Sequence, residues 1–329
     1  MDPRIKVGLV GTGHMGQYHV NVAVGLNDYD VLGIYDADGA RCTEIAERFG
    51  VRPYTEYSQM LDEVDAVVVA VPTVHHHKIA LEAVQAGRHV LVEKPMTETV
   101  AQARELVELA DSKNLIFQVG HVERFNGAVL ELGKMVDQPI LIESRRLAPF
   151  SPRINDVGVV LDLMIHDIDI VLNLVNDNVS SVHARGVSVF SPREDVAVAT
   201  LQFESGTVAN LVASRATQAK VRRLNITQPN AFIVLDFATQ DIDVHRRASS
   251  AYLMTREELK YKQEAFVEKI AVHRDNPLRQ EHQHFIACIR GSQEPIVGGQ
   301  EELRTLEIAN EILGQIESTM AKIDAGVTA

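Results

Sequence analysis

The feature that most constrains the fold is an alternation of short apolar runs with helical stretches between residues 5 and 119. The helical stretches between the runs end at glycines such as Gly50 and Gly87, and glycine is favoured directly after a helix. Near-continuous apolar strands that are separated by helices indicate a parallel sheet with helices on both faces. This part of the chain therefore predicts an α/β domain. The β-branched runs that we expect to form its strands are Ile5–Val10, Val31–Tyr35, Ala66–Ala70, His89–Val92 and Leu115–Val119.

The pattern changes after about residue 122, where strands follow one another without intervening helices. A strand at Ile140–Arg146 and a long apolar helix at Val157–Val175 precede the alternating segments "VAVATLQF" and "TVANLVAS", which predict a β-hairpin. Consecutive strands of this kind indicate an α+β domain built on a largely antiparallel, open sheet. We therefore expect two domains, 1–122 and 123–329, and the length of 329 residues favours the same division.

The composition excludes several classes of partner. The formal net charge is −13, whereas a nucleic-acid-binding protein needs a basic stripe to contact phosphates. No apolar run is long enough to span a bilayer, and the N-terminus lacks the apolar stretch of a signal peptide. No metal site is expected, because His75, His76 and His77 are consecutive and point in different directions. Cys42 and Cys288 lie far apart, which fits a reducing compartment, so we expect a cytoplasmic protein that binds neither nucleic acid nor a membrane.

Three glycines follow the first apolar run with the spacing GxGxxG, in the segment "VGTGHMG". A strand before the motif, a helix after it and an acidic residue about 20 positions later distinguish a dinucleotide-binding turn from an ordinary glycine turn. Gly11 permits the tight turn, Gly13 admits a pyrophosphate, and Gly16 lets the helix pack against the sheet. Asp36 is placed to accept hydrogen bonds from the ribose hydroxyls of NAD and to repel the 2′-phosphate of NADP. We therefore expect NAD, although Arg41 on the following helix offers a contact for that phosphate.

Charged residues also follow the run His89–Val92, in the segment "HVLVEKPMT". Ligands of open parallel sheets bind beyond the carboxyl ends of the strands, so Glu93 and Lys94 stand at the expected place. A solvated strand end is the alternative interpretation of the same residues.

The predicted helix "GVVLDLMIHDIDIVLNLV" carries ionisable side chains in an otherwise apolar sequence. Asp162 and His166 are spaced i,i+4 and so share a face, with Asp169 three residues further on. Burying such groups costs free energy unless they are paired, and a histidine that is oriented by a carboxylate is suited to act as a general base. A lysine nearby would stabilise the developing alkoxide or carbonyl oxygen. A structural His–Asp pair is the alternative.

Taken together, these motifs resemble those of the Gfo/Idh/MocA family of NAD(P)-dependent oxidoreductases. The resemblance covers almost the whole chain and rests on "VGTGHMG", Asp36, "VPTVHHH", "EKP", "GHVERFN", "GVVLDLMIHDID" and "EPIVGGQEELRTLEIANEI". It implies a Rossmann domain followed by an α+β domain whose open sheet commonly forms the interface of a homodimer or homotetramer. It also implies that Lys94, Asp162 and His166 surround the nicotinamide and the substrate, and that the bond before Pro95 is cis.

The resemblance extends to the loop that follows the run Ala66–Ala70. The family's usual TPxxxH is "VPTVHH" here, in which Pro72 and His76 match and Val71 replaces the threonine. This replacement removes one hydroxyl contact without threatening cofactor binding. The residues that we expect to surround NAD are Gly11, Thr12, Gly13, His14, Met15, Gly16, Asp36, Val71, Pro72, Thr73, His76, Glu93, Lys94 and Pro95.

Within the family, "GHVERFNGAVLEL" and "SRRLAPFSPRINDVGVVLDLMIHDIDI" most resemble the UDP-N-acetylglucosamine 3-dehydrogenase branch, although Gly127 replaces its usual proline. The branch implies oxidation of the C3 alcohol of a UDP-N-acetyl-hexosamine, and spare arginines suit its diphosphate. We expect His166 to accept the hydroxyl proton, Asp162 to orient His166, and Lys94 to polarise the oxygen, so these three are the candidate catalytic residues. The expected substrate-binding residues are Lys94, Arg124, Asn126, Arg146, Asp162 and His166.

Three alternatives stay open on the sequence alone. Lys94 is a second candidate for the base, although a lysine must first lose its proton, which favours His166. The substrate is alternatively an inositol, another polyol or a free sugar. A protein of a different class, an NAD-binding sensor without catalysis, would also explain the glycine turn, but it has no need to keep Lys94, Asp162 and His166 together.

Overall fold

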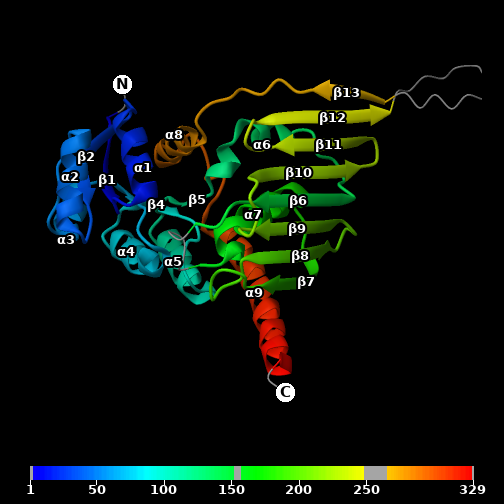
Figure 1. Cartoon of the computed structure of the whole chain (residues 1–329). Helices are drawn as coiled ribbons and strands as arrows, with labels where there is room; N and C mark the ends of the chain where they lie inside the picture. The colour runs from blue at the N-terminus through cyan, green and yellow to red at the C-terminus, as the bar shows by residue number, and fades with distance from the viewer. Residues whose placement is uncertain (1–2, 152–156, 248–264, 328–329) are drawn as a thin grey trace, which may run out of the picture. The chain divides into compact units, whose positions relative to one another are not determined.

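The computed structural model describes residues 3–151, 157–247 and 265–327, and the chain forms two compact units (Figure 1). The first unit comprises Met1–Phe125 and Asp275–Glu307, and the second comprises Asn126–Arg274 and Ile308–Ala329. The sequence-based division had assigned all of 123–329 to the second domain, whereas residues 275–307 belong with the first unit. Within the described ranges, no helix combines the length and the apolar character that a membrane span needs.

The first unit is built on a five-stranded parallel sheet with the strand order β2-β1-β3-β4-β5. Strand β3 is buried at every residue, as expected for a strand with helices on both faces. The parallel sheet predicted from the apolar runs is therefore confirmed. Its strands are β1 (Ile5–Val10), β2 (Tyr29–Tyr35), β3 (Ala66–Val69), β4 (His89–Glu93) and β5 (Phe117–Gly120). Its helical segments are α1 (His14–Val24), α2 (Gly39–Phe49), α3 (Tyr57–Glu63), α4 (Thr73–Gln85), α5 (Val100–Ser112), η1 (Val122–Phe125) and α8 (Pro277–Ile289).

Helix α8 brings a late part of the chain into the core of the first unit. Its Phe285 and Ile286 are buried and pack in the same cluster as Leu9 of β1. The helix begins where the Asn276 side chain accepts N–H groups of the first turn, and Pro277 occupies the first helical position. The amphipathic pattern predicts that this helix covers a sheet, but the pattern does not say which sheet.

The second unit is built on an eight-stranded sheet with the order β13-β12-β11-β10-β6-β9-β8-β7. Among the described strands, β6 and β9 pair in parallel and the other neighbours are antiparallel, which confirms the predicted largely antiparallel sheet. The strands are β6 (Leu141–Leu147), β7 (Val179–Val187), β8 (Val196–Phe203), β9 (Val208–Ser214), β10 (Val221–Gln228), β11 (Ala231–Asp236), β12 (Asp241–Arg247) and β13 (Ala265–Lys269). The helical segments are α6 (Gly127–Leu132), η2 (Val160–Met164), α7 (Ile165–Val175) and α9 (Gly299–Val327), which begins in the first unit.

The two faces of the second sheet differ in burial. Along β8, Ala197 and Ala199 are fully buried, while Val198 between them is 44% exposed. The buried set packs with Ile168 of α7 and Ile312 of α9 in one hydrophobic core. Because side chains alternate along a strand, the opposite face of the sheet is the accessible one.

Candidate active site

The glycine turn joins β1 to α1, at the carboxyl ends of the parallel strands. Gly11 has a φ of +95°, and a Cβ on Gly11 would lie 2.5 Å from the carbonyl oxygen of Ala70. A Cβ on Gly16 would lie 2.0 Å from the carbonyl oxygen of Gly11, so α1 packs on the turn only without a side chain there. Around Gly13 no atom lies within 4 Å of such a Cβ. The glycines are therefore suited to the three predicted roles, with Gly13 leaving the backbone open to a pyrophosphate.

Asp36 braces this turn from the end of β2. Its Oδ2 accepts the N–H and the hydroxyl of Thr12, each at 2.7 Å. Its Oδ1 accepts the N–H of Asp38 at 2.8 Å and Nη2 of Arg41 at 3.0 Å. Burial alone would raise the pKa of Asp36, but these hydrogen bonds outweigh it and lower the pKa. The carboxylate is therefore charged and fixed, as a partner for ribose hydroxyls requires, and Arg41 is tied to it.

The loop after β3 holds the matched "VPTVHH" segment. Pro72 occupies the position directly before α4, which begins at Thr73. The buried His76 ring lies between two backbone carbonyls: Nδ1 is 2.8 Å from the oxygen of Pro95, and Nε2 is 2.8 Å from the oxygen of Val71. Burial lowers the pKa of His76. The His76 ring therefore lies between this loop and the EKP loop, and its contact with the cofactor stays a prediction.

The EKP loop follows β4, and its Lys94–Pro95 peptide bond is cis, which confirms the sequence-based expectation. The N–H of Lys94 donates to Oε2 of Glu93 at 3.2 Å. One residue beyond the proline, the N–H of Met96 donates to Oε1 of Glu302 at 3.2 Å, and Oε2 of Glu302 lies 2.5 Å from Nε2 of His121. Buried side chains thus hold the backbone on both sides of the cis bond.

Several of these supporting residues were missed by the sequence analysis. Glu302 is fully buried in the first turn of α9, and His121 is fully buried next to the end of β5. His19 is also buried, and its Nε2 lies 2.8 Å from Oε1 of Glu93. The only sequence signal was a histidine or carboxylate inside an otherwise apolar helical face, as His19 shows in "MGQYHVNVA".

The segment of the second unit that carries Asp162 and His166 is not one regular helix. The sequence predicted a continuous helix over Val157–Val175, whereas the structure has a π-helical turn, η2, followed by α7. Asp162 lies in the π turn and His166 in the first turn of α7, and both are partly accessible. Asp169 is buried. Single π turns inside helices are frequent at functional sites, which supports the choice of this segment.

The start of η2 is anchored to the strand region before β8. Oε1 of Glu194 accepts the N–H of Val160 at 3.0 Å, and the carbonyl oxygen of Glu194 accepts the N–H of Val159 at 3.0 Å. A Cβ on Gly158 would lie 2.0 Å from Glu194 Oε1, so the close approach depends on glycine. Nη1 of Arg215 donates to the oxygen of Val157 at 3.0 Å. These long-range contacts fix where the turn begins, and no local pattern in the sequence signals them.

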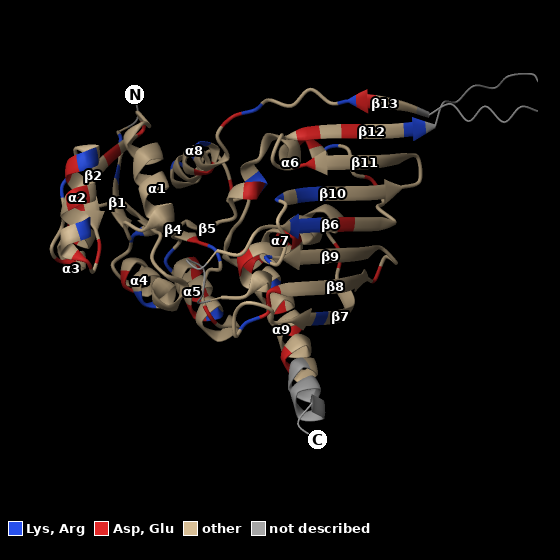
Figure 2. Ribbon diagram, viewed as in Figure 1, with Lys and Arg blue, Asp and Glu red and all other residues tan. Residues whose placement is uncertain are grey.

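Arg146, an expected substrate-binding residue, is paired inside the second unit. It is 2% exposed, and it donates to the carboxylate of Asp167 from Nε at 3.1 and 3.2 Å and from Nη2 at 2.8 Å. Its guanidinium also lies 4.9 Å from the ring centroid of Phe237. Figure 2 shows basic residues side by side on β6 and β10, where Arg146 is opposite Arg222 in the strand register. The pairing favours a structural role for Arg146, different from the expected contact with a diphosphate.

Arg124 and Asn126 are also engaged by backbone groups. Arg124 is buried in η1 and donates to the carbonyl oxygen of Ile296 at 3.2 Å. The side chain of Asn126 caps α6, since its oxygen accepts the N–H of Ala128 at 3.1 Å while its nitrogen donates to the oxygen of Phe237 at 3.1 Å. Both side chains therefore support the backbone, and a role in binding substrate stays a prediction.

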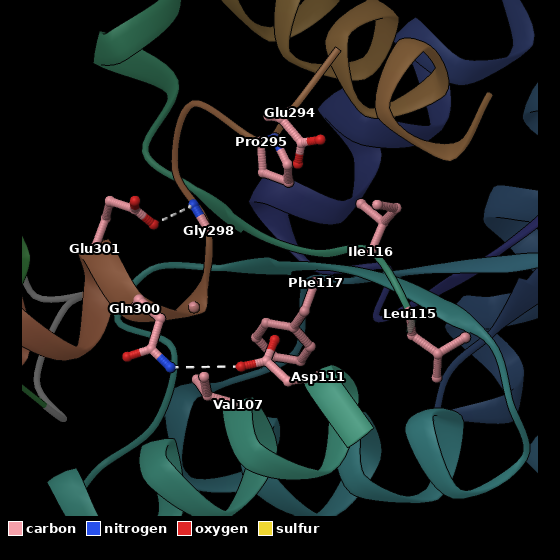
Figure 3. Close-up of a pocket in the computed structure, with 11 residues that line it drawn as sticks. Val107, Asp111, Leu115, Ile116, Phe117, Glu294, Pro295, Gly298, Gln300 and Glu301 are labelled. Carbon is pink, nitrogen blue, oxygen red and sulfur yellow. Dashed lines mark hydrogen bonds between the residues drawn. The ribbon is translucent and has the colours of Figure 1, made fainter. Parts of the chain in front are cut away.

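The first unit also contains a cavity of about 330 Å³ (Figure 3). Asp111, Glu294 and Glu301 line it, and none of the residues expected at NAD does. Two hydrogen bonds join residues of its lining: Gln300 Nε2 donates to Asp111 Oδ2 at 3.5 Å, and the N–H of Gly298 donates to Glu301 Oε2 at 3.1 Å (Figure 3). Acidic walls do not suit a dinucleotide, and the described residues contain no group of three or more side chains arranged to hold a metal ion.

Comparison with known families decides the class of the protein. The family described as "Oxidoreductase family, NAD-binding Rossmann fold" matches residues 5–121, and the family described as "GFO/IDH/MocA C-terminal domain" matches residues 131–234. The chain belongs to the Gfo/Idh/MocA family. This Gfo/Idh/MocA protein is therefore an NAD-dependent dehydrogenase, which confirms the predicted family and cofactor and removes the alternative of a sensor without catalysis.

Relatives of this Gfo/Idh/MocA protein have different substrates in their names. It is 32% identical to UDP-N-acetylglucosamine 3-dehydrogenase of Acidithiobacillus ferrooxidans over 82% of this chain and 90% of that protein. A solved structure of that enzyme superposes with a TM-score of 0.88 at 29% identity, covering 96% of this chain and 99% of the other. The scyllo-inositol 2-dehydrogenase of Bacillus subtilis is 23% identical over 94% of this chain and 93% of that protein. The WlbA dehydrogenase of Bordetella pertussis, solved with NADH and UDP-GlcNAcA, shares the fold with a TM-score of 0.78 at 21% identity, covering 96% and 97%.

Proposed function

We propose that the protein oxidises the C3 hydroxyl of a UDP-N-acetyl-hexosamine to the 3-keto sugar. The observation that carries the proposal is the similarity to UDP-N-acetylglucosamine 3-dehydrogenase, 32% identical over 82% of this chain. The presence of Lys94, Asp162 and His166 supports the same reaction, because oxidation of an alcohol needs a base for the hydroxyl proton and a cation near the oxygen.

In the proposed reaction each side chain has a separate task. NAD, when bound, supplies the carbon that accepts the hydride. The glycine turn and the N-terminus of α1 bind the pyrophosphate, and Asp36 binds the adenosine ribose. His166 takes the hydroxyl proton at a ring nitrogen, Asp162 orients His166, and Lys94 polarises the oxygen that becomes a carbonyl.

The substrate is tested with a panel read by NADH fluorescence. UDP-N-acetylglucosamine, UDP-N-acetylgalactosamine, free N-acetylglucosamine and myo-inositol are each supplied with NAD, and the product is identified by mass spectrometry. We expect turnover with a UDP-N-acetyl-hexosamine and none with the free sugar. Indifference to every UDP-sugar would remove the proposed substrate.

The residue roles are tested with Lys94→Met and His166→Asn. We expect each change to lower kcat by about 10²–10⁴-fold, the usual contribution of positioned proton transfer, with little change in the affinity for NAD. The matched control is His77→Gln on α4, because Nε2 of His77 lies 2.9 Å from Oε2 of Glu105 on α5 and His77 is not among the expected site residues. Unchanged turnover in both Lys94→Met and His166→Asn would contradict the assignment even if the substrate is correct.

An inositol is the second candidate substrate, and the observation that favours it is the similarity to scyllo-inositol 2-dehydrogenase over 94% of the chain. A polyol carries no diphosphate, so its binding needs no cation beyond Lys94. Turnover of scyllo- or myo-inositol that exceeds turnover of every UDP-sugar would establish this alternative.

We also propose that the protein forms a homodimer or homotetramer through the accessible face of the second sheet. On this face Val198 of β8 is 44% exposed and Phe232 of β11 is 38% exposed. Exposed apolar side chains that share one face of a sheet are typical of a protein–protein interface. Light scattering after gel filtration measures the mass directly. We expect a multiple of 36.4 kDa, and Phe232→Asp should shift it toward the monomer.

A further inference from the structure

A row of buried polar side chains begins at the glutamate of the EKP segment, and the reaction as proposed gives this row no chemical step. Its members are Glu93 at the end of β4, His19 on α1, His282 on α8 and Tyr29 at the start of β2, and we call this set the Glu93 relay. Glu93 is 8% exposed and the other three are at most 3% exposed. Ionisable groups are rarely buried together at this depth without a function, because each must be desolvated.

The members of the Glu93 relay contact one another in sequence. Oε1 of Glu93 lies 2.8 Å from Nε2 of His19, and Nδ1 of His19 lies 2.9 Å from Nε2 of His282. Nδ1 of His282 lies 3.3 Å from the hydroxyl of Tyr29. Both nitrogens of each ring are therefore used, and the row runs without a break from Tyr29 to the residue before Lys94.

With both rings neutral, one arrangement of protons satisfies every contact. A carboxylate only accepts, so Nε2 of His19 must carry the proton. Nδ1 of His19 then accepts from Nε2–H of His282, and Nδ1 of His282 accepts from the hydroxyl of Tyr29. Burial raises the pKa of Tyr29, so the phenol keeps its proton and can donate. All hydrogen bonds point toward Glu93, an order in which each bond polarises the next.

We propose that His19, His282 and Tyr29 are positioning residues, whose hydrogen bonds hold Glu93 in one orientation as a carboxylate and thereby fix Lys94 for the reaction. Glu93 contacts Lys94 directly, because the backbone N–H of Lys94 donates to Oε2 of Glu93 while Oε1 of Glu93 contacts His19. The inference rests on the proposed role of Lys94. It adds residues from α1, α8 and β2 to the site, none of which the family motifs around Lys94 include.

The other ionisable groups around Glu93 are consistent with a charged carboxylate. His19, Lys94 and His76 face it, and Glu281 of α8 lies close enough to interact. Burial raises the pKa of Glu93, but the hydrogen bond from His19 and the positive charge of Lys94 outweigh burial and lower the pKa. Burial, with the charge of Glu93, raises the pKa of Glu281 well above its ordinary value. Glu281 therefore stays protonated and leaves Glu93 as the negative charge beside Lys94.

The first test needs no substrate. In the protein labelled with ¹⁵N-histidine, the nitrogen shifts report which ring nitrogen carries the proton. We expect His19 and His282 each to carry it on Nε2. Assignment uses His19→Gln and His282→Gln. A proton on Nδ1 of either ring would overturn the relay whether or not the proposed substrate is correct.

The second test measures kcat in His19→Phe, Glu93→Gln and the double variant. Because a hydrogen bond to a charged group is lost, we expect His19→Phe to lower kcat about tenfold or more, with the affinity for NAD changed less than twofold. The double variant should match Glu93→Gln alone, since both changes break the same connection. His19→Gln, whose amide can donate to Glu93 and accept from His282, should recover most of the lost kcat.

A matched control separates the relay from loss of a buried histidine. His284 lies on α8 like His282 and is buried, but its ring contacts Gln293 at 2.7 Å and the N–H of Ile296 at 3.0 Å. We expect His284→Gln to lower the melting temperature without changing kcat. The proposal would be overturned if the fold-loss of kcat in the double variant equals the product of the losses in His19→Phe and Glu93→Gln. A His19→Gln variant as slow as His19→Phe would also overturn it.

Discussion

The buried pair between Arg146 and Asp167 allows a test of what the arginine does. Asp167→Asn keeps the shape of the side chain and removes the negative charge that Asp167 places against the guanidinium. The pair is held by three contacts of 2.8–3.2 Å, and each side chain is 2% exposed. Breaking a pair at this depth costs about 3–5 kcal/mol, so we expect the free energy of unfolding to fall by that amount. Urea unfolding followed by circular dichroism measures the change.

The double variant Arg146→Met with Asp167→Leu decides between structure and substrate binding. Replacing a buried ion pair by apolar residues of similar volume is often neutral or stabilising, so this variant should recover the stability that Asp167→Asn loses. If Arg146 is structural, the KM for the UDP-sugar stays at the parent value in the recovered protein. A stable double variant with a KM raised tenfold or more would refute this reasoning and would show that Arg146 binds the substrate.

Three further outcomes are expected. Asp36→Ala should weaken NAD binding and raise the relative affinity for NADP, measured by fluorescence titration, because the carboxylate is lost and Arg41 is released. Gly13→Ala should melt at the parent temperature and bind NAD poorly, whereas Gly16→Ala should melt lower, because a Cβ at Gly16, unlike one at Gly13, meets backbone at 2.0 Å. Burial raises the pKa of Asp195, but three backbone N–H groups and an arginine hold it well below its ordinary value. Its stabilisation is therefore complete above the unfolded pKa of about 3.9 and is lost as the pH falls toward the folded pKa, so Asp195→Asn should flatten acid unfolding followed by circular dichroism.

The sequence predicted those parts of the fold in which the spacing of apolar and polar residues along the chain is enough to determine the structure. Strands such as Ala66–Val69 are continuous apolar runs because both faces are covered, and β8 alternates because one face is accessible. The glycine turn could be predicted because its steric demands fall on the motif itself, at Gly11 and Gly16. The cis bond before Pro95 was predicted from the resemblance to the family.

The remaining features depend on partners that are distant in the sequence. The π turn at Asp162 follows from anchoring by Glu194, which is 34 residues away from the N–H it accepts. Arg146 looked like a spare cation because its partner Asp167 lies on another element. The sequence analysis did not single out His19, since its partner His282 is 263 residues further along the chain. Local patterns carry no information about such pairs, so these roles could be found only in the folded chain.

The return of residues 275–307 makes the NAD-binding unit discontinuous in the sequence. Phe285 and Ile286, which complete its core, are translated only after the whole second sheet. The first 125 residues contain every strand of their sheet. During synthesis, however, the apolar surface that α8 later buries stays exposed to solvent until α8 has been made. A fragment cut at residue 122 should need detergent or a chaperone to stay dispersed, and the ability to bind NAD should arise late in translation.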